Sequence, residues 1–351
     1  MSILPKVNPF PRGQSFDRDR TLMVCAEGFE DRSLSFASTI RQIAFANTFV
    51  ITYRPIRKSR LPELMSACAA CSRASPEPIT YDRFRPAGFE SEIASRLKET
   101  LKHIDEIVID ISVMSKLMIL ILLNAVSTYS GKVRIIYSEP LDYAPTRSIF
   151  EENLRTLQMA AALPSYGVHD VVRTPMLTSV IMQRSPAIIV AFTSFNEKLI
   201  RALLSNFNPT HLFLINGVPP TLSWREDATQ RIHADILNDY RGDNPIDDLG
   251  KMQRRASTLY YDETFSVVGG IYREYCVSNR IVLAPTGSKM QALGCALVKL
   301  CCPDVHIEYP TPESFLIDGF SSTEIKCIHQ VQFPQFKDFI SRLAIESKLN
   351  G

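Results

Sequence analysis

Two short loops in this sequence combine hydroxyl side chains with a lysine, a set of groups that suits a phosphate. In the second half of the chain, Thr286, Gly287, Ser288 and Lys289 follow an apolar run and precede a helical pattern. Backbone N–H groups, hydroxyls and one positive charge at the start of a helix are what a phosphate ligand requires. The alternative is a simple helix start, in which Ser288 or Thr286 caps the backbone and Lys289 is solvated.

The corresponding loop in the first half of the chain adds an acid. Asp110 ends an apolar run, and Ser112, Ser115 and Lys116 follow it before the next helical pattern. Asp110 is a candidate acid, base or metal ligand, and the three residues after it are candidate ligand-binding residues. A helix cap or a turn-forming aspartate explains Asp110 equally well.

A second acidic turn follows the first apolar run of the chain. Between positions 27 and 32 it holds Glu27, Glu30, Asp31 and Arg32, with Gly28 allowing a close backbone approach. Glu27 and Glu30 are candidate catalytic residues, since such a cluster can bind a ribose, hold a metal or supply an acid or base. The alternative is a capped helix with acids favourably placed on its first turn.

An acid and an aromatic residue recur after the last apolar run of each half. Glu139 and Tyr143 are candidate ligand-binding residues in the first half, where the tyrosine could stack on a base. Glu313 and Phe315 stand at the equivalent place in the second half. The pattern predicts two related half-sites.

These loops belong to a unit that occurs twice in the chain. Four pairs of segments recur in the same order and at nearly constant separation, each an apolar run ending in a polar turn or a proline. The pairs are 21–32 with 187–198, 48–55 with 211–219, 107–116 with 281–289, and 133–140 with 305–312. We interpret them as two diverged copies of one strand and helix unit.

The apolar runs predict an α/β fold. They are continuously apolar rather than alternating, which is typical of a parallel sheet covered by helices on both faces. We therefore expect two tandem Rossmann-like units with parallel sheets flanked by helices. The expected ranges are 1–145 for the first unit, 146–186 for a connecting helical segment, 187–330 for the second unit with a helical insertion or lid at 221–262, and 331–351 for a C-terminal helix.

The bulk composition is that of a folded globular protein. Apolar residues make up 45% and charged residues 22% of the 351 residues, and the eight cysteines are typical of buried thiols in a reducing compartment. The net charge of +2 argues against a nucleic-acid partner but leaves one open. The longest apolar run, 117–126, is shorter than the roughly 20 residues that cross a bilayer. We expect a cytoplasmic protein with no membrane partner.

No pattern in the sequence predicts a metal site or a particular cofactor. Cys68 and Cys71 form a lone CxxC without a second pair, and the six histidines form neither HxH nor HExxH. Leu283 stands where a Walker loop has its first glycine, and GxGxxG and GxSxG are missing. The cofactor stays unassigned.

The loop of Thr286 to Lys289, after a buried strand in a duplicated Rossmann-like unit, resembles the ligand loops of CRISPR-associated Rossmann fold (CARF) domains. In that loop the lysine is often preceded by Gly-Thr, whereas here a serine, Ser288, stands directly before the lysine. The duplicated core is also similar to the SAVED domains of bacterial anti-phage signalling. The resemblance implies a sensor of cyclic oligonucleotides made during phage infection. Because no effector domain is visible in the sequence, it also implies a separate effector subunit.

Three functions remain open at this point. The first is a nucleotide-binding sensor, in which Lys116 and Lys289 hold phosphates. The second is a nucleotide-processing hydrolase or transferase that uses Glu27, Glu30 or Asp110. The third is a scaffold subunit of a larger defence complex. The sequence also leaves open whether the chain forms a homo-oligomer.

Overall fold

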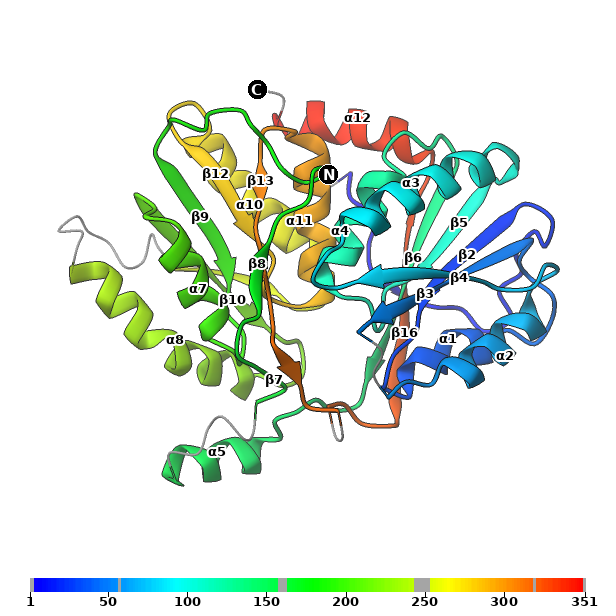
Figure 1. The fold of residues 1–351 in the computed structure, drawn as a ribbon, viewed down its shortest axis with the longest axis horizontal. Helices are drawn as coiled ribbons and strands as arrows, with labels where there is room; N and C mark the ends of the chain where they lie inside the picture. Colours follow the sequence, from blue (N-terminus) through cyan, green and yellow to red (C-terminus); the bar gives the residue numbers. More distant parts are fainter. Residues whose placement is uncertain (1–2, 56–57, 157–162, 243–252, 318–319, 350–351) are drawn as a thin grey trace. The chain divides into compact units, whose positions relative to one another are not determined.

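The computed structural model describes residues 3–55, 58–156, 163–242, 253–317 and 320–349 (Figure 1). The chain divides into two compact units, Met1–Tyr143 with Ile317–Leu343 and Ala144–Leu316 with Ala344–Gly351. The first unit has a mostly parallel sheet and the second a parallel one, each flanked by helices, which confirms the expected Rossmann-like α/β class.

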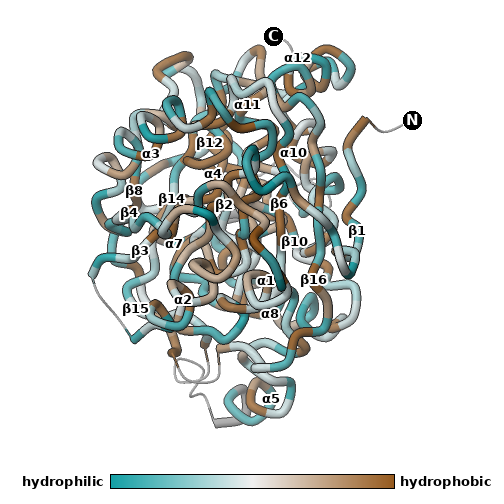
Figure 2. The backbone as a smooth tube through the Cα atoms, turned by 90° about the vertical axis from the view of Figure 1, so that its right-hand side faces the viewer, coloured by the Kyte–Doolittle hydropathy of each residue, from teal (hydrophilic) through white to brown (hydrophobic). Residues whose placement is uncertain are grey.

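Seven strands form the sheet of the first unit, in the order β1-β16-β6-β5-β2-β3-β4. The strands are β1 Asn8–Pro9, β2 Thr21–Ala26, β3 Asn47–Arg54, β4 Glu77–Asp82, β5 Glu106–Asp110, β6 Lys132–Pro140 and β16 Ile325–Phe333. Neighbours from β6 to β4 pair in parallel, while β16 runs antiparallel to β6 and β1 antiparallel to β16. All of β2 is buried, as expected of a central parallel strand, and Figure 2 colours it as hydrophobic.

Helices connect the parallel strands of the first unit. They are α1 Arg32–Thr39, α2 Leu61–Cys71, α3 Ala87–Thr100 with a 3-10 turn at Leu101–His103, and α4 Lys116–Ala125. The last helix, α12 Phe336–Glu346, follows β16, and its residues from Ala344 onward belong to the second unit. Phe36 of α1 and Leu64 of α2 pack with Met23 and Val50 of the sheet in one apolar cluster. Each fully buried side chain of this kind contributes about 1.5–3 kcal/mol to folding.

The second unit has a five-stranded parallel sheet in the order β11-β10-β9-β12-β13. Its strands are β9 Ala187–Phe192, β10 His211–Val218, β11 Gln253–Ser257, β12 Arg280–Ala284 and β13 His306–Ile307. Its helices are α5 Arg147–Thr156, α7 Lys198–Asn206, α8 Trp224–Gly242, α10 Tyr261–Tyr275 and α11 Lys289–Cys301. Two small antiparallel pairs complete it: β7 Ser165–Tyr166 with β15 Ser314–Phe315, and β8 Asp170–Val172 with β14 Tyr309–Thr311.

The two sheets share one connectivity. Numbered along the chain within each unit, the five parallel strands lie in the order 3-2-1-4-5, which is the order of the Rossmann fold. The four pairs of repeated segments fall on equivalent strands: β2 with β9, β3 with β10, β5 with β12, and β6 with β13. The sequence repeat and the topology therefore agree strand by strand.

The structure differs from the expected ranges in three places. The range 221–262, expected as a helical insertion or lid, holds α8 and also β11, which is the third strand of the second sheet. The boundary expected at residue 330 cuts through β16, which pairs with β6 in the first unit. The range 146–186, expected as a connecting helical segment, holds α5 and also the short strands β7 and β8, and 157–162 lie outside the described residues.

None of the helices in the described part of the chain is both long enough and apolar enough to cross a bilayer.

Candidate ligand site at the carboxyl edge of the first sheet

The first sheet reverses its strand order between β2 and β5. From β2 the chain passes through α1 to β3 on one side, and from β5 through α4 to β6 on the other. In open α/β sheets the crevice for a ligand lies at the carboxyl ends of such a strand pair. At Gly28 a Cβ atom would lie 2.9 Å from Cβ of Val113, so the loops after β2 and β5 meet there and glycine permits the contact.

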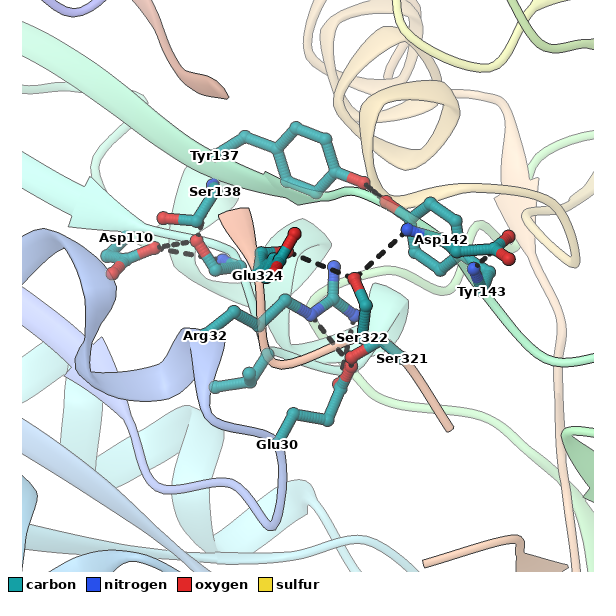
Figure 3. Close-up of polar contacts among 12 residues, drawn as sticks. Glu30, Arg32, Asp110, Tyr137, Ser138, Asp142, Tyr143, Ser321, Ser322 and Glu324 are labelled. Carbon is teal, nitrogen blue, oxygen red and sulfur yellow. Dashed lines mark hydrogen bonds and ion pairs between the residues drawn. The ribbon is translucent and has the colours of Figure 1, made fainter. Parts of the chain in front are cut away.

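A buried ion pair stands at the start of α1, directly after β2 (Figure 3). Arg32 is 1% exposed, and its Nε and Nη2 donate to the two carboxylate oxygens of Glu30 at 2.8 and 2.9 Å. Ser321 also donates to Glu30 Oε2, at 2.6 Å. Burial is the largest single effect and acts to lower the pKa of Arg32, but the Glu30 charge, the two nearby tyrosines and the hydrogen bond to Glu30 together outweigh it, so the pKa is raised.

Asp110, at the end of β5, lies in a buried hydrogen-bond network. It accepts hydrogen bonds from the backbone N–H of Ser112, at 3.0 Å, and from the Ser112 hydroxyl. That hydroxyl in turn accepts from the backbone N–H of Ser138, at 2.8 Å. Burial raises the pKa of Asp110 to about 6, against the opposing effects of Ser112 and the Arg32 charge.

Strand β6 contributes Tyr137, and the loop after it contributes Tyr143. The hydroxyls of Tyr137 and Tyr143 are hydrogen-bonded at 2.5 Å, and the Arg32 guanidinium lies 5.6 Å from the centre of the Tyr143 ring. Burial raises the pKa of both tyrosines, so both are neutral near pH 7.

Glu139, between the two tyrosines in sequence, is held by β16. It accepts from His329 Nε2 at 2.8 Å and from Lys326 Nζ at 3.1 Å. Burial acts to raise the pKa of Glu139, but these hydrogen bonds outweigh it and the pKa is lowered. Glu139 is therefore charged, and its two partners are the Lys326 ammonium group and the His329 imidazole.

The start of α4 carries the Ser-Lys pair of the first unit. Ser115 caps the helix, accepting from the backbone N–H of Met118 at 3.2 Å, and its own N–H donates to the Tyr53 hydroxyl at 2.8 Å. Lys116 is the first residue of α4 and is half-buried. Burial lowers the pKa of Lys116 to about 8.

Glu27 lies at the same edge and holds the end of β3. One carboxylate oxygen accepts from the backbone N–H of Tyr53, and the other accepts from Ser59 at 2.8 Å. Both oxygens of this buried side chain thus have partners within the protein. These contacts are those of a residue that stabilises the local structure.

The Ser-Lys loop of the second unit is a well-formed helix start. Ser288 caps α11 in a reciprocal capping box with Gln291, and its hydroxyl donates to the carbonyl of Thr258 at 2.7 Å. Thr286 Oγ1 accepts from the N–H of Phe192 at 2.9 Å and donates to its carbonyl. The loop is thereby fastened to the end of β9.

Gly287 and Lys289 complete this loop. A Cβ atom on Gly287 would lie 2.0 Å from Gln291 Oε1 and 2.9 Å from Cβ of Phe192, so the capping box requires glycine there. Lys289 is the first residue of α11 and is half-buried. The hydroxyls of this loop are therefore engaged in capping the helix and in bonds to neighbouring backbone groups, as in the alternative given above. Ligand contact by Thr286 to Lys289 stays a prediction.

The structure gathers part of the predicted set at one edge of the first unit. The predicted residues found there are Glu27, Glu30, Asp110, Ser112, Ser115, Lys116, Glu139 and Tyr143. The predicted set lacked Arg32, Tyr137, Lys326, Ser321 and His329. Arg32 could have been added to the predicted set, because the sequence places an arginine at the start of a helix after a buried strand. The sequence holds no signal for the three residues near or on β16, because they lie far along the chain from the loops that they contact.

The edge can donate and accept hydrogen bonds and can exchange a proton at Asp110, but its described residues do not form a metal centre. No group of three or more His, Cys, Asp or Glu side chains is arranged to hold a metal ion in the part of the chain that the structure describes. The eight cysteines are free thiols, and burial raises the pKa of Cys71 to about 12, which makes it a poor nucleophile.

No family model and no curated protein sequence matches the chain.

Proposed function

We propose that the first unit binds a nucleotide, or a related phosphorylated molecule, at the carboxyl ends of β2 and β5. The observation that carries the proposal is the reversal of strand order at this point, bordered by polar loops on both sides. In Rossmann-like sheets the ligand lies in such a crevice and its phosphate at a helix start. Here α4 begins at that place with Ser115 and Lys116.

Among phosphorylated molecules, a cyclic oligonucleotide is the specific candidate. The resemblance of the chain to CARF and SAVED domains supports it, as does the repeated strand order of the two units. Binding would then act as a sensing step in anti-phage defence, read by a separate effector subunit.

Calorimetric titration of nucleoside mono- and triphosphates and of cyclic di- and trinucleotides tests the proposal. We expect at least one to bind, and a Lys116→Ala variant to lose roughly tenfold to hundredfold in affinity, the effect of removing a hydrogen bond from a charged group. Lys289→Ala is the matched control, because it occupies the same position on α11. Equal loss in both variants, or no binding by the wild type, argues against a site in the first unit.

An enzyme that hydrolyses or transfers part of a nucleotide is the second candidate. Asp110 favours it, since a buried carboxyl whose pKa is raised to about 6 can take up or release a proton near neutral pH. Asp110→Asn keeps the hydrogen-bond acceptor and removes the titrating group. If the protein turns over a nucleotide, this variant should bind it and lose turnover. Full turnover by Asp110→Asn contradicts the assignment.

A further inference from the structure

The serine that caps α4 is held by a tyrosine from β3. The Ser115 N–H donates to the Tyr53 hydroxyl at 2.8 Å, and that hydroxyl donates to the carbonyl of Val113 at 3.3 Å. The backbone N–H of Tyr53 in turn donates to Glu27. Tyr53 thus joins the end of β3 to the loops after β2 and β5, which are the two loops that border the proposed ligand site.

The cap of α11 in the second unit is built within its own helix. There the Ser288 N–H donates to Oε1 of Gln291, in the first turn of α11, at 2.8 Å. Met118 stands at the equivalent position of α4, and its thioether is a weak hydrogen-bond acceptor. In the first unit the Tyr53 hydroxyl therefore accepts the bond that Gln291 accepts in the second.

Gly217 occupies the place of Tyr53 in the second unit. In the first unit Glu27, which follows β2, accepts from the Tyr53 N–H. In the second unit Thr193, which follows β9, accepts from the Gly217 N–H at 3.4 Å. A Cβ atom on Gly217 would lie 2.9 Å from Cγ2 of Thr258, which leaves little room for a tyrosine. The tyrosine is thus found in the unit whose helix start lacks a capping glutamine.

This difference changes what fixes the start of each helix. The α11 cap moves with its helix, whereas the α4 cap is referenced to β3, the neighbouring strand of the sheet. Lys116 follows Ser115 directly, so a shift of the capping serine also shifts the lysine. A binding group has to be held within about 0.5 Å of its productive position by the residues that support it.

We infer that Tyr53 is a positioning residue of the ligand site in the first unit: its hydroxyl fixes Ser115, and through it Lys116, where the lysine meets the phosphate. This inference rests on the proposed function of the first unit. It adds a residue that sets the affinity for the phosphate without contacting the ligand.

Removal of the Tyr53 hydroxyl tests the inference. The probes are the 5′-mono- and triphosphates of adenosine, guanosine, cytidine and uridine, titrated by ligand-observed NMR up to millimolar concentration. Tyr53→Phe keeps the ring that packs edge-on against Tyr81 and should weaken binding roughly threefold to tenfold, the effect of one lost hydrogen bond. In a Lys116→Ala background the same substitution should cause no further loss, because the hydroxyl acts through the lysine.

Tyr129→Phe is the matched control. Tyr129 is another tyrosine of the first unit with a buried side chain, and its hydroxyl donates to the carbonyl of Ile104 at 3.0 Å, at the opposite end of the sheet. This variant should lose stability and keep its nucleotide affinity. Amide hydrogen exchange measures the positioning bond without any ligand: exchange at Ser115 should be several-fold faster in Tyr53→Phe and unchanged in Tyr129→Phe.

Three results would overturn the inference. The first is a Tyr53→Phe variant with wild-type or higher nucleotide affinity. The second is a loss that adds to that of Lys116→Ala in the double variant, which makes the hydroxyl independent of the lysine. The third is an equal loss of affinity in Tyr129→Phe, which makes the effect one of general stability.

The outcome also separates the two proposals. Nucleotide binding that depends on Lys116 but not on Tyr53 contradicts the positioning role and leaves the proposed function standing. Unchanged exchange at Ser115 in Tyr53→Phe contradicts the positioning role whether or not a nucleotide binds. If no nucleotide binds the wild type, the proposed function fails, and the role of Tyr53 in a ligand site fails with it.

Discussion

The residues at the carboxyl edge of the first sheet are held by one another, and their electrostatics can be measured. Glu30 is the main partner of the buried Arg32. Burial raises the pKa of Asp110, and the Arg32 charge opposes that rise. Two predictions follow from these contacts, one on the ion pair and one on the titration of Asp110.

Removing one member of the ion pair should be more harmful than removing both. Glu30→Gln leaves the Arg32 charge buried without its counter-ion and should lower the free energy of unfolding by about 3–5 kcal/mol. The double variant Glu30→Gln with Arg32→Met should recover most of that loss, since it buries no unpaired charge. Urea denaturation of the three proteins measures the differences. Equal losses in the single and double variants contradict a buried, mutually dependent pair.

Asp110 should make stability depend on pH. Its pKa is about 6 in the folded protein, above the value near 3.9 of an unfolded chain, so the folded state holds the proton more tightly. Stability should therefore fall as the pH rises through this interval, by up to about 3 kcal/mol relative to Asp110→Asn. Denaturation of both proteins at pH 4.5 and pH 8 isolates the effect. A difference between them that is the same at both pH values contradicts the raised pKa.

At the scale of elements, the starts of α4 and α11 look alike in sequence and differ in structure. Ser288 has a capping box with Gln291, whereas Ser115 receives one helix N–H and contacts tyrosines of neighbouring strands. The serine of the second loop thus caps its helix and Gly287 leaves room for the capping box, while ligand contact by this loop stays a prediction.

Ser288→Ala should destabilise the protein without changing ligand affinity at the first unit. The loss of the N-cap and of its bond to Thr258 should cost about 1–2 kcal/mol. Ser341→Ala, on the exposed face of α12, is the control and should change stability by less than about 0.5 kcal/mol. Thermal unfolding and nucleotide titration together provide the readout. Weakened nucleotide binding in Ser288→Ala would instead indicate ligand contact at the second loop.

The sequence predicts best those strands whose residue pattern fits only one kind of element. Apart from polar residues at their ends, β2, β5, β9 and β12 are continuously apolar, because both faces of a central parallel strand are covered. β4 and β11 lie at sheet edges, and β11 carries Gln253, Arg254 and Arg255, so its pattern is not that of a buried strand.

The site was partly predictable for a related reason. Loops after parallel strands meet at one edge, so Asp110, Glu30 and Glu139 could be placed together from the order of the strands alone. Which of them face hydrogen-bond partners could not be predicted, because the partners His329 and Ser321 come from sequence almost two hundred residues or more away.

At the scale of the whole chain, each unit is assembled from two separate stretches of sequence. β16 supplies the last large strand of the first sheet, pairing with β6 from Phe333 to Ile325, and it also supplies the partners of Glu139. A first unit that ends at Tyr143 lacks this strand and exposes the edge of β6.

A rebuilt first unit should fold where the plain fragment fails. Residues 1–143 alone should aggregate or remain partly unfolded, whereas 1–143 joined by a short glycine and serine linker to 320–343 should fold, because Tyr143 and Ser321 are bridge partners. Circular dichroism and the dispersion of amide NMR signals measure the outcome. A well-folded 1–143 fragment contradicts the role given to β16.

A crystal structure of the full chain with the best-binding nucleotide tests the central claim most directly. Our account predicts that the nucleotide lies at the carboxyl ends of β2 and β5, with a phosphate at Lys116. A nucleotide seated at the loop of Thr286 to Lys289, with the edge of the first sheet unchanged, would contradict it.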